Sequence, residues 1–226
     1  GNTIIKTPNI DAFSAMSINL SNYHVGTTCS PTRAGLMTGR NCLRNGVWHT
    51  NAGCSLLNQE EETIANIFSN GGYQTAMFGK WHLGHSQEIF HPNQRGFDDF
   101  YGHLHTEVGY FPPFSNQGGI DFQKNGVTID DQGYSTFLLA REASNWINSR
   151  DKEKPFFMYV PFLAPHTPLE APDDLIDKYK DLEDRRKPTR NISADRAREL
   201  SNTLAPSARP LYAAVVDALD SAIGII

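Results

Sequence analysis

The feature that most restricts the fold is the continuous apolar segment from Pro155 to Leu163. It lacks the alternation of polar and apolar residues that marks a strand with one face in water, and is typical of a strand buried on both faces. A second strand is predicted at Tyr73–Phe78, and predicted helices alternate with these strands. The pattern predicts an α/β fold with a mostly parallel central sheet and helices on both faces.

Helix and turn signals divide the rest of the chain. Thr7 and Pro8 have the residue types of an N-cap and first helical position. Further helices are predicted at Ser30–Met37, Glu60–Asn70, Ser135–Ser149 and from Tyr212 onward, a short strand at Ile18–Val25, and a hairpin turn at Asn125-Gly126. The charged segment Asp173–Arg209 is predicted to lie mostly on the surface.

Composition excludes several classes of protein. The 226 residues are 39% hydrophobic and 20% charged, as in an ordinary globular protein rather than a disordered one. The net charge of −5 argues against a large nucleic-acid-binding surface, and no run approaches the roughly 20 apolar residues of a membrane span. Cys42 and Cys54 could pair in an oxidising compartment or remain thiols, and their spacing does not decide between these.

A first cluster of chemical interest is Cys29-Ser30-Pro31-Thr32-Arg33, followed by Thr38-Gly39-Arg40. Pro31 predicts that Cys29 lies at a helix N-terminus, where free backbone N–H groups favour an anion. Arg33, one turn later on the same face, could bind a tetrahedral oxyanion. The residues therefore describe a nucleophile beside an anion site, although an isolated Cys of this kind is more often a buried helix residue.

Two further clusters follow predicted strands, where ligands bind in parallel sheets. After the first strand comes Gly79-Lys80-Trp81-His82-Leu83-Gly84. If this segment is extended, Lys80 and His82 point to the same side and could hold an anion and move a proton. His166 lies between Pro165 and Pro168, which restrict its backbone. The ordinary alternative for Lys80 and His82 is a solvated edge of the sheet. For His166 it is a structural histidine that caps a loop.

Together these motifs resemble the type I sulfatases, which depend on formylglycine. Cys-x-Pro-x-Arg with Thr-Gly-Arg is similar to the first signature of that family, and Gly72-Tyr73-x-Thr75 with Gly79–Gly84 to the second. The resemblance implies an arylsulfatase-like sulfuric ester hydrolase with the alkaline-phosphatase-like α/β sandwich. It also implies a periplasmic, secreted or lysosomal location.

The resemblance also implies a role for each residue. A maturation enzyme would convert Cys29 to formylglycine, whose hydrate attacks sulfur and is also a ligand of a divalent metal, usually Ca²⁺. Arg33 would position the hydrate, Lys80 would contact both nucleophile and sulfate, and His166 would assist the leaving oxygen. His82 would take the proton that restores the aldehyde. Arg95-Gly96-Phe97-Asp98 resembles a family segment that we interpret as structural.

The carboxylate ligands of the family's metal site are expected outside this chain. We therefore expect residues 1–226 to be part of a sulfatase catalytic domain that lacks its first strand and its C-terminal part. Such a piece is expected to bind Ca²⁺ poorly and to be inactive alone. Substrate choice would depend on loops at the pocket rim, for which Gly102–Gly119 and Asp173–Arg209 are candidates.

Three other functions stay open. A phosphonate or phosphodiester hydrolase of the same superfamily can use the same nucleophile motif. A non-catalytic relative could bind sulfated glycans, but the intact set of Cys29, Arg33, Lys80, His82 and His166 argues against this. A cysteine hydrolase would instead need a thiolate at Cys29.

Overall fold

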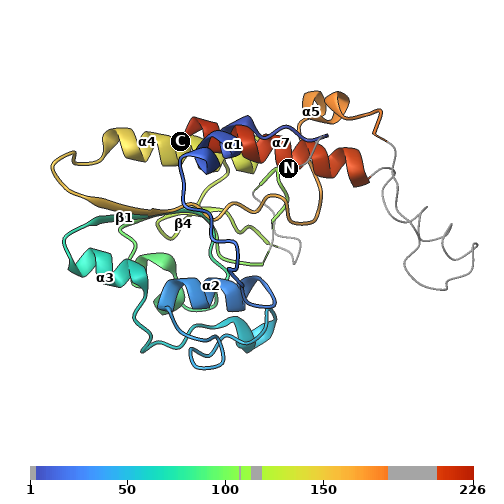
Figure 1. Ribbon diagram of the computed structural model, residues 1–226. Helices are drawn as coiled ribbons and strands as arrows, with labels where there is room; N and C mark the ends of the chain where they lie inside the picture. Colours follow the sequence, from blue (N-terminus) through green and yellow to red (C-terminus); the bar gives the residue numbers. More distant parts are fainter. Residues whose placement is uncertain (1–3, 107, 113–118, 183–207) are drawn as a thin grey trace, which may run out of the picture.

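The computed structural model describes residues 4–106, 108–112, 119–182 and 208–226, and has a five-stranded sheet at its centre (Figure 1). The strands are β1 (Gln74–Lys80), β2 (Asp99–His103), β3 (Gln123–Lys124), β4 (Val127–Thr128) and β5 (Phe156–Tyr159), in the order β4-β3-β2-β1-β5. β1 runs parallel to both β2 and β5, while β3 and β4 form an antiparallel hairpin beside β2. The predicted α/β class with a mostly parallel centre is confirmed.

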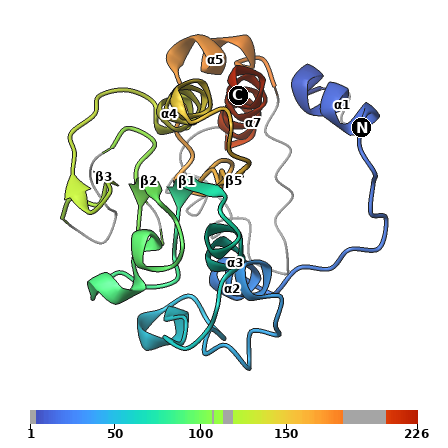
Figure 2. The ribbon, with the colours of Figure 1, turned by 90° about the vertical axis from the view of Figure 1, so that its left-hand side faces the viewer.

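Helices cover both faces of this sheet (Figures 1 and 2). One face carries α1 (Pro8–Ala15), α4 (Ser135–Ser149), α5 (Asp173–Lys178) and α7 (Ala208–Ile225). The other carries α2 (Cys29–Thr38) and α3 (Ile64–Asn70). Three short 3₁₀ helices, η1 (Ala52–Ser55), η2 (Glu88–Phe90) and η3 (Pro92–Gln94), lie in the connections.

The central strand β1 is buried on both faces. Met77 packs with Ala34 of α2 in one hydrophobic core, whereas Phe78 packs with Leu139 of α4 in another. Successive side chains of a strand point to opposite faces, so one short segment contributes to both cores. This packing explains why the consecutive residues Ala76, Met77 and Phe78 are all apolar.

Asp220 of α7 joins the two ends of the described chain. Its side chain is 2% exposed and accepts hydrogen bonds from the backbone N–H groups of Asn9 (3.2 Å) and Ile10 (2.8 Å). The Asn9 side-chain amide donates to the same carboxylate at 2.9 Å. These donors belong to the first turn of α1, where free N–H groups favour an anion. Asp220 therefore caps α1 and holds it against α7.

Two strand predictions need correction. Ile18–Val25 forms no strand in the described structure; it is exposed, and Ile18 is 92% exposed. The apolar run Pro155–Leu163 contains only the four-residue strand β5, whose residues are partly or fully exposed. β5 lies at the edge of the described sheet, so one of its sides lacks a neighbouring strand and it is not buried like β1.

The other elements match their predictions more closely. α2 ends before Gly39, and α4 spans Ser135–Ser149 as expected. α3 begins at Ile64 rather than Glu60, because Thr63 and Asn66 form a reciprocal capping box at its start. Asn125 and Gly126 form the turn between β3 and β4, with φ of 49° and 80°, as tight hairpin turns require.

The strands β1 and β2 approach each other closely at the carboxyl end of the sheet. Gly79 and Gly102 are paired in the register of β1 and β2, and Gly102 has φ of 150°. A Cβ atom on Gly102 would lie 2.1 Å from the carbonyl oxygen of Gly79, so a larger residue does not fit. The following pair in the register, Lys80 and His103, begins the polar region at this end of the sheet.

Part of the segment Asp173–Arg209 lies outside the described residues, which include α5 and the beginning of α7. Among the helices that are described, none combines the length and apolar character needed to span a membrane.

Candidate active site

Cys29 is the first residue of α2, as its sequence motif predicts. Thr28 precedes the helix with an extended backbone, and Ser30 and Pro31 are buried within the first turn. The Cys29 side chain is partly exposed. A helix start of this kind directs backbone N–H groups towards the space around residue 29, which favours a negatively charged group there.

His82 follows β1, but its backbone is not extended. It has φ of 57°, in the left-handed region that side chains other than glycine seldom adopt. The prediction that Lys80 and His82 point to one side of an extended segment is therefore wrong in its geometry. Lys80 is instead the last residue of β1 and His82 has a left-handed backbone, and both residues are buried. Strained backbone of this kind is often found at functional sites.

The imidazole of His82 lies between Cys29 and Thr50. Nδ1 is 3.4 Å from Sγ of Cys29, and Nε2 is 3.1 Å from the backbone carbonyl oxygen of Thr50. Because a carbonyl oxygen only accepts hydrogen bonds, Nε2 carries the proton in the neutral ring and Nδ1 is left as an acceptor. The basic nitrogen therefore faces the side chain at position 29.

The environment keeps His82 neutral. Burial lowers its pKa to about 3, and the positive charges of Lys80 and Arg33 act in the same direction, while the hydrogen bond to Thr50 opposes them. At neutral pH the ring is unprotonated at Nδ1 and can accept a proton.

Arg33 and Lys80 place two cations near this imidazole. Arg33 donates a hydrogen bond through Nη1 to the backbone carbonyl of Lys80 and lies 3.5 Å from the hydroxyl of Tyr159. This contact fixes α2 against the end of β1. The Lys80 side chain is 1% exposed. Tyr159, at the end of β5, was not predicted; burial raises the pKa of its hydroxyl, which therefore remains protonated.

His103 is a second residue that the sequence did not indicate. It pairs with Lys80 in the β1–β2 register and is 2% exposed. Its ring nitrogens make no hydrogen bond of good geometry within the described residues, although the His105 backbone interacts with the ring. Burial lowers its pKa well below the usual value, with further contributions from Lys80 and Arg33. The position of His103 at the end of a strand could have indicated its role, but the sequence analysis did not predict β2.

His166 lies in the loop after β5, beside the same edge of the sheet. Its side chain is exposed, and its Nδ1 is 2.6 Å from the Thr167 carbonyl oxygen. Its backbone carbonyl accepts a hydrogen bond of 2.8 Å from the hydroxyl of Tyr110. Tyr110 is fully buried and stacks on Tyr134, with ring centroids 5.3 Å apart.

Glu170 completes the attachment of this loop. Its carboxylate accepts the N–H of Tyr110 at 2.7 Å, and its backbone carbonyl accepts the hydroxyl of Tyr134 at 2.9 Å. Cys29, Arg33, Lys80 and His82 are joined by direct contacts and charge interactions. The parallel pairing of β1 and β5 brings the His166 loop to their edge, and a direct role for its ring stays a prediction.

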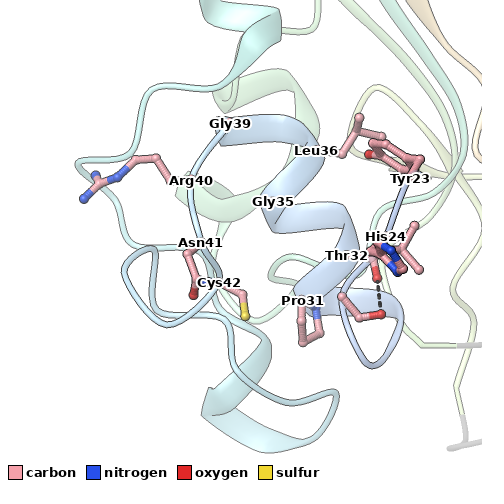
Figure 3. Close-up of a pocket in the computed structure, with 12 residues that line it drawn as sticks. Tyr23, His24, Pro31, Thr32, Gly35, Leu36, Gly39, Arg40, Asn41 and Cys42 are labelled. Carbon is pink, nitrogen blue, oxygen red and sulfur yellow. Dashed lines mark hydrogen bonds between the residues drawn. The ribbon is translucent and has the colours of Figure 1, made fainter. Parts of the chain in front are cut away.

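A cavity of about 350 Å³ lies beside α2, lined partly by Pro31, Thr32 and Cys42 (Figure 3). In its wall, the hydroxyl of Thr32 donates a hydrogen bond of 3.1 Å to the Gly26 carbonyl, drawn as a dashed line in Figure 3. Cys29 does not line this cavity, so it is separate from the cluster around His82. Cys42 and Cys54 are free thiols in the structure.

The described residues do not fit a calcium site. Ca²⁺ needs six to eight oxygen ligands. Within residues 4–106, 108–112, 119–182 and 208–226, no group of three or more His, Cys, Asp or Glu side chains is arranged to hold a metal ion. The cationic neighbours of Cys29 favour an anion instead.

The family model for Sulfatase matches residues 1–226. The chain belongs to the sulfatase family. Arylsulfatase J of Mus musculus is 32% identical over 190 residues, covering 79% of this chain and 31% of that protein. Arylsulfatase of Klebsiella aerogenes is 31% identical over 192 residues, covering 78% of this chain and 41% of that protein.

A solved structure shares the fold. Ps i-CgsB in complex with k-i-k-neocarrahexaose is similar with a TM-score of 0.81 and 28% identity, covering 100% of this chain and 49% of that chain. The alkaline-phosphatase-like fold expected of a sulfatase is therefore confirmed. This chain spans less than half the length of each of these three similar proteins.

Proposed function

We propose that the whole protein hydrolyses sulfate monoesters and that residues 1–226 are part of its longer catalytic domain. The reaction breaks the sulfur–oxygen bond of the ester and transfers the sulfuryl group to an oxygen nucleophile, and the alcohol leaves with a proton. Sulfate is then released, and one water molecule is consumed in all. Membership of the sulfatase family supports this reaction class. It favours sulfate esters over phosphonates or phosphate diesters, because the curated relatives above are arylsulfatases.

The contact between Cys29 and His82 is the observation that most supports this proposal. A neutral imidazole directs its basic nitrogen towards Sγ at 3.4 Å, while two buried or partly buried cations lie close by. A base next to the nucleophile, with positive charge for the transferred anion, is what sulfuryl transfer requires.

We further propose that Cys29 is converted to formylglycine by a maturation enzyme that reads Cys29, Pro31 and Arg33. The hydrate of this aldehyde would supply an oxygen nucleophile at position 29. The site fits such a group, because the side chain lies at a helix N-terminus and faces an unprotonated nitrogen of His82. An O–H group at this position would be a stronger hydrogen-bond donor to Nδ1 than the thiol is.

Each of the other residues then has a defined task. Arg33 positions the group at residue 29 through the fixed contact of its guanidinium with the end of β1. Lys80 neutralises the sulfate oxygens from its buried position next to His82. His166 gives a proton to the leaving alcohol oxygen from its loop beyond β5. His82 accepts the proton of the second hydroxyl at residue 29 while the carbon–oxygen bond to sulfate breaks. This step releases sulfate and restores the aldehyde, and water then re-forms the hydrate.

No catalytic step is assigned to calcium, since the described residues do not offer a ligand set for it. Calcium in the whole protein would need carboxylate ligands from outside the described residues, with only the modified residue 29 contributed by this cluster.

The decisive experiment uses the whole protein, co-expressed with a formylglycine-generating enzyme. Mass spectrometry of the Cys29 peptide should show a loss of about 18 Da relative to the thiol, as expected for conversion of the thiol to an aldehyde. Activity on 4-nitrophenyl sulfate should require that conversion and should disappear in Cys29→Ala. Full activity with an unmodified thiol, or with alanine at residue 29, would overturn the proposal.

The same protein distinguishes the alternatives. A phosphonate or phosphodiester hydrolase would prefer an aryl phosphate diester to the matched aryl sulfate. A glycan-binding relative would bind sulfated sugars without turnover. A cysteine hydrolase would lose activity with iodoacetamide, whereas the formylglycine enzyme would retain it.

A further inference from the structure

A second cavity, of about 250 Å³, shares the His82 side chain with the proposed active site. Its walls include Thr50, Asn51, Ser55 and Thr106, which carry hydroxyl or amide groups. None of the residues that line it is aliphatic, and none is Phe, Tyr or Trp. Most small-molecule pockets are mainly apolar with a few polar groups, so this composition is unusual.

Two further histidines, His85 and His105, form another part of the wall. Their ring centroids are 3.9 Å apart. Burial lowers the pKa of His85, and His105 acts in the same direction, while Asp121 opposes them. A neutral imidazole has one hydrogen-bond donor and one acceptor. A hydroxyl group can also donate and accept, so an imidazole and a hydroxyl group can form a hydrogen bond in either direction.

The His105 wall is held by its backbone rather than by its ring. The Asp121 carboxylate accepts the N–H groups of Leu104 at 3.0 Å and of His105 at 2.7 Å. The imidazole of His105 is therefore not needed for these contacts, and the loop places it at the cavity. Side chains held in this way can determine specificity without supporting the fold.

The cavity is one side chain away from the proposed nucleophile. The His82 ring that lines it also directs Nδ1 towards Cys29. We infer that this cavity receives the alcohol part of the sulfate ester, and that the substrate class is a sulfated carbohydrate whose neighbouring hydroxyl groups bind His85 and His105. This inference rests on the proposed sulfatase function. An aryl leaving group would offer these walls no hydroxyl groups to bind.

The test compares two substrate classes on the whole, formylglycine-containing protein. The substrates are a panel of monosaccharide monosulfates and 4-nitrophenyl sulfate, and the readout is the ratio of their kcat/KM values. His105→Phe keeps a ring against His85 but removes both nitrogens. We expect kcat/KM for the preferred sugar sulfate to fall at least about tenfold, while that for 4-nitrophenyl sulfate changes less than about threefold.

His85→Phe should have the same selective effect, and His24→Phe is the matched control, because His24 lies outside this cavity and hydrogen-bonds Asn22. Thermal unfolding checks that the variants fold, and His105→Gln, which restores hydrogen bonding, should recover part of the sugar activity. Equal losses on both substrates, or an unchanged ratio, would overturn the inference.

The two levels of the proposal fail differently. If the wild-type protein cleaves 4-nitrophenyl sulfate but no sugar sulfate, the carbohydrate inference is wrong while the sulfatase proposal stands. If the modified protein cleaves neither substrate, the proposed function itself is wrong.

Discussion

The hydroxyl of Tyr110 donates a hydrogen bond of 2.8 Å to the backbone carbonyl of His166. This bond connects a fully buried, stacked tyrosine to the loop that carries a proposed acid. Tyr110→Phe keeps the ring and removes the bond. We expect kcat of the whole protein on 4-nitrophenyl sulfate to fall about three- to tenfold with little change in KM, and stability to fall by about 1 kcal/mol.

Tyr134→Phe is the matched control, because it removes a similar hydrogen bond of 2.9 Å to Glu170, four residues further along the loop. Its stability loss should be comparable and its effect on kcat smaller. Equal effects on kcat would show that Tyr110 acts through general stability and does not position His166.

Removal of the proposed base should impair turnover. In His82→Asn the new residue tolerates the left-handed backbone, with φ of 57°, but lacks the basic nitrogen that faces Cys29. We expect kcat to fall roughly 10²- to 10⁴-fold, the usual range for loss of a general base. Steady-state kinetics on an aryl sulfate measure this, with His24→Asn as control. A kcat within threefold of wild type would exclude His82 from proton transfer.

Asp220 should matter for stability. Asp220→Ala leaves the N–H groups of Asn9 and Ile10 without their acceptor and removes the cap of α1. The expected loss in the free energy of unfolding is about 2–4 kcal/mol, measured by chemical denaturation. Asp11→Ala, which removes only an exposed bond to Thr7, should change it by less than about 0.5 kcal/mol. Similar losses in both variants would contradict the capping role.

His103 should make the protein sensitive to acid. Burial, Lys80 and Arg33 lower its folded-state pKa, so the unfolded chain binds more protons as pH falls below about 6.5. The contribution of the neutral His103 to the free energy of unfolding is therefore fully present above about pH 6.5 and is lost as the pH falls below it. His103→Phe should reduce this decrease between pH 7.5 and 5.0 by at most about 1.4 kcal/mol per pH unit.

At pH 7.5 the same variant should differ from wild type by no more than about 1 kcal/mol, because the imidazole nitrogens make no hydrogen bond of good geometry within the described residues. The pKa of His82 is also lowered, so some dependence of stability on pH should remain in His103→Phe. Denaturant midpoints measured across this pH range provide the test, with His24→Phe as control. An unchanged slope in His103→Phe would show that its ring does not titrate as expected.

Local signals explain which elements were predictable. α2 and α4 follow from capping residues and apolar spacing, which act within a few turns of one helix. The start of α3 was misplaced because the acidic residues from Glu60 were taken as its first turn. The reciprocal hydrogen bonds of Thr63 and Asn66 instead begin the helix at Ile64. Ile18–Val25 and β5 were misjudged because a strand depends on its neighbours, and these are not visible in the strand's own sequence.

By itself, the sequence determined the α/β class, the family and the residues with suitable chemistry at Cys29, Arg33, Lys80, His82 and His166. Only the tertiary structure decided how some of them meet: the left-handed turn that directs Nδ1 towards Cys29, the Thr50 carbonyl that selects its tautomer, and the buried His103 beside Lys80. The physical reason is that residue types and local periodicity are written along the chain. The orientation and protonation of a side chain, by contrast, depend on burial and partners that come from distant segments.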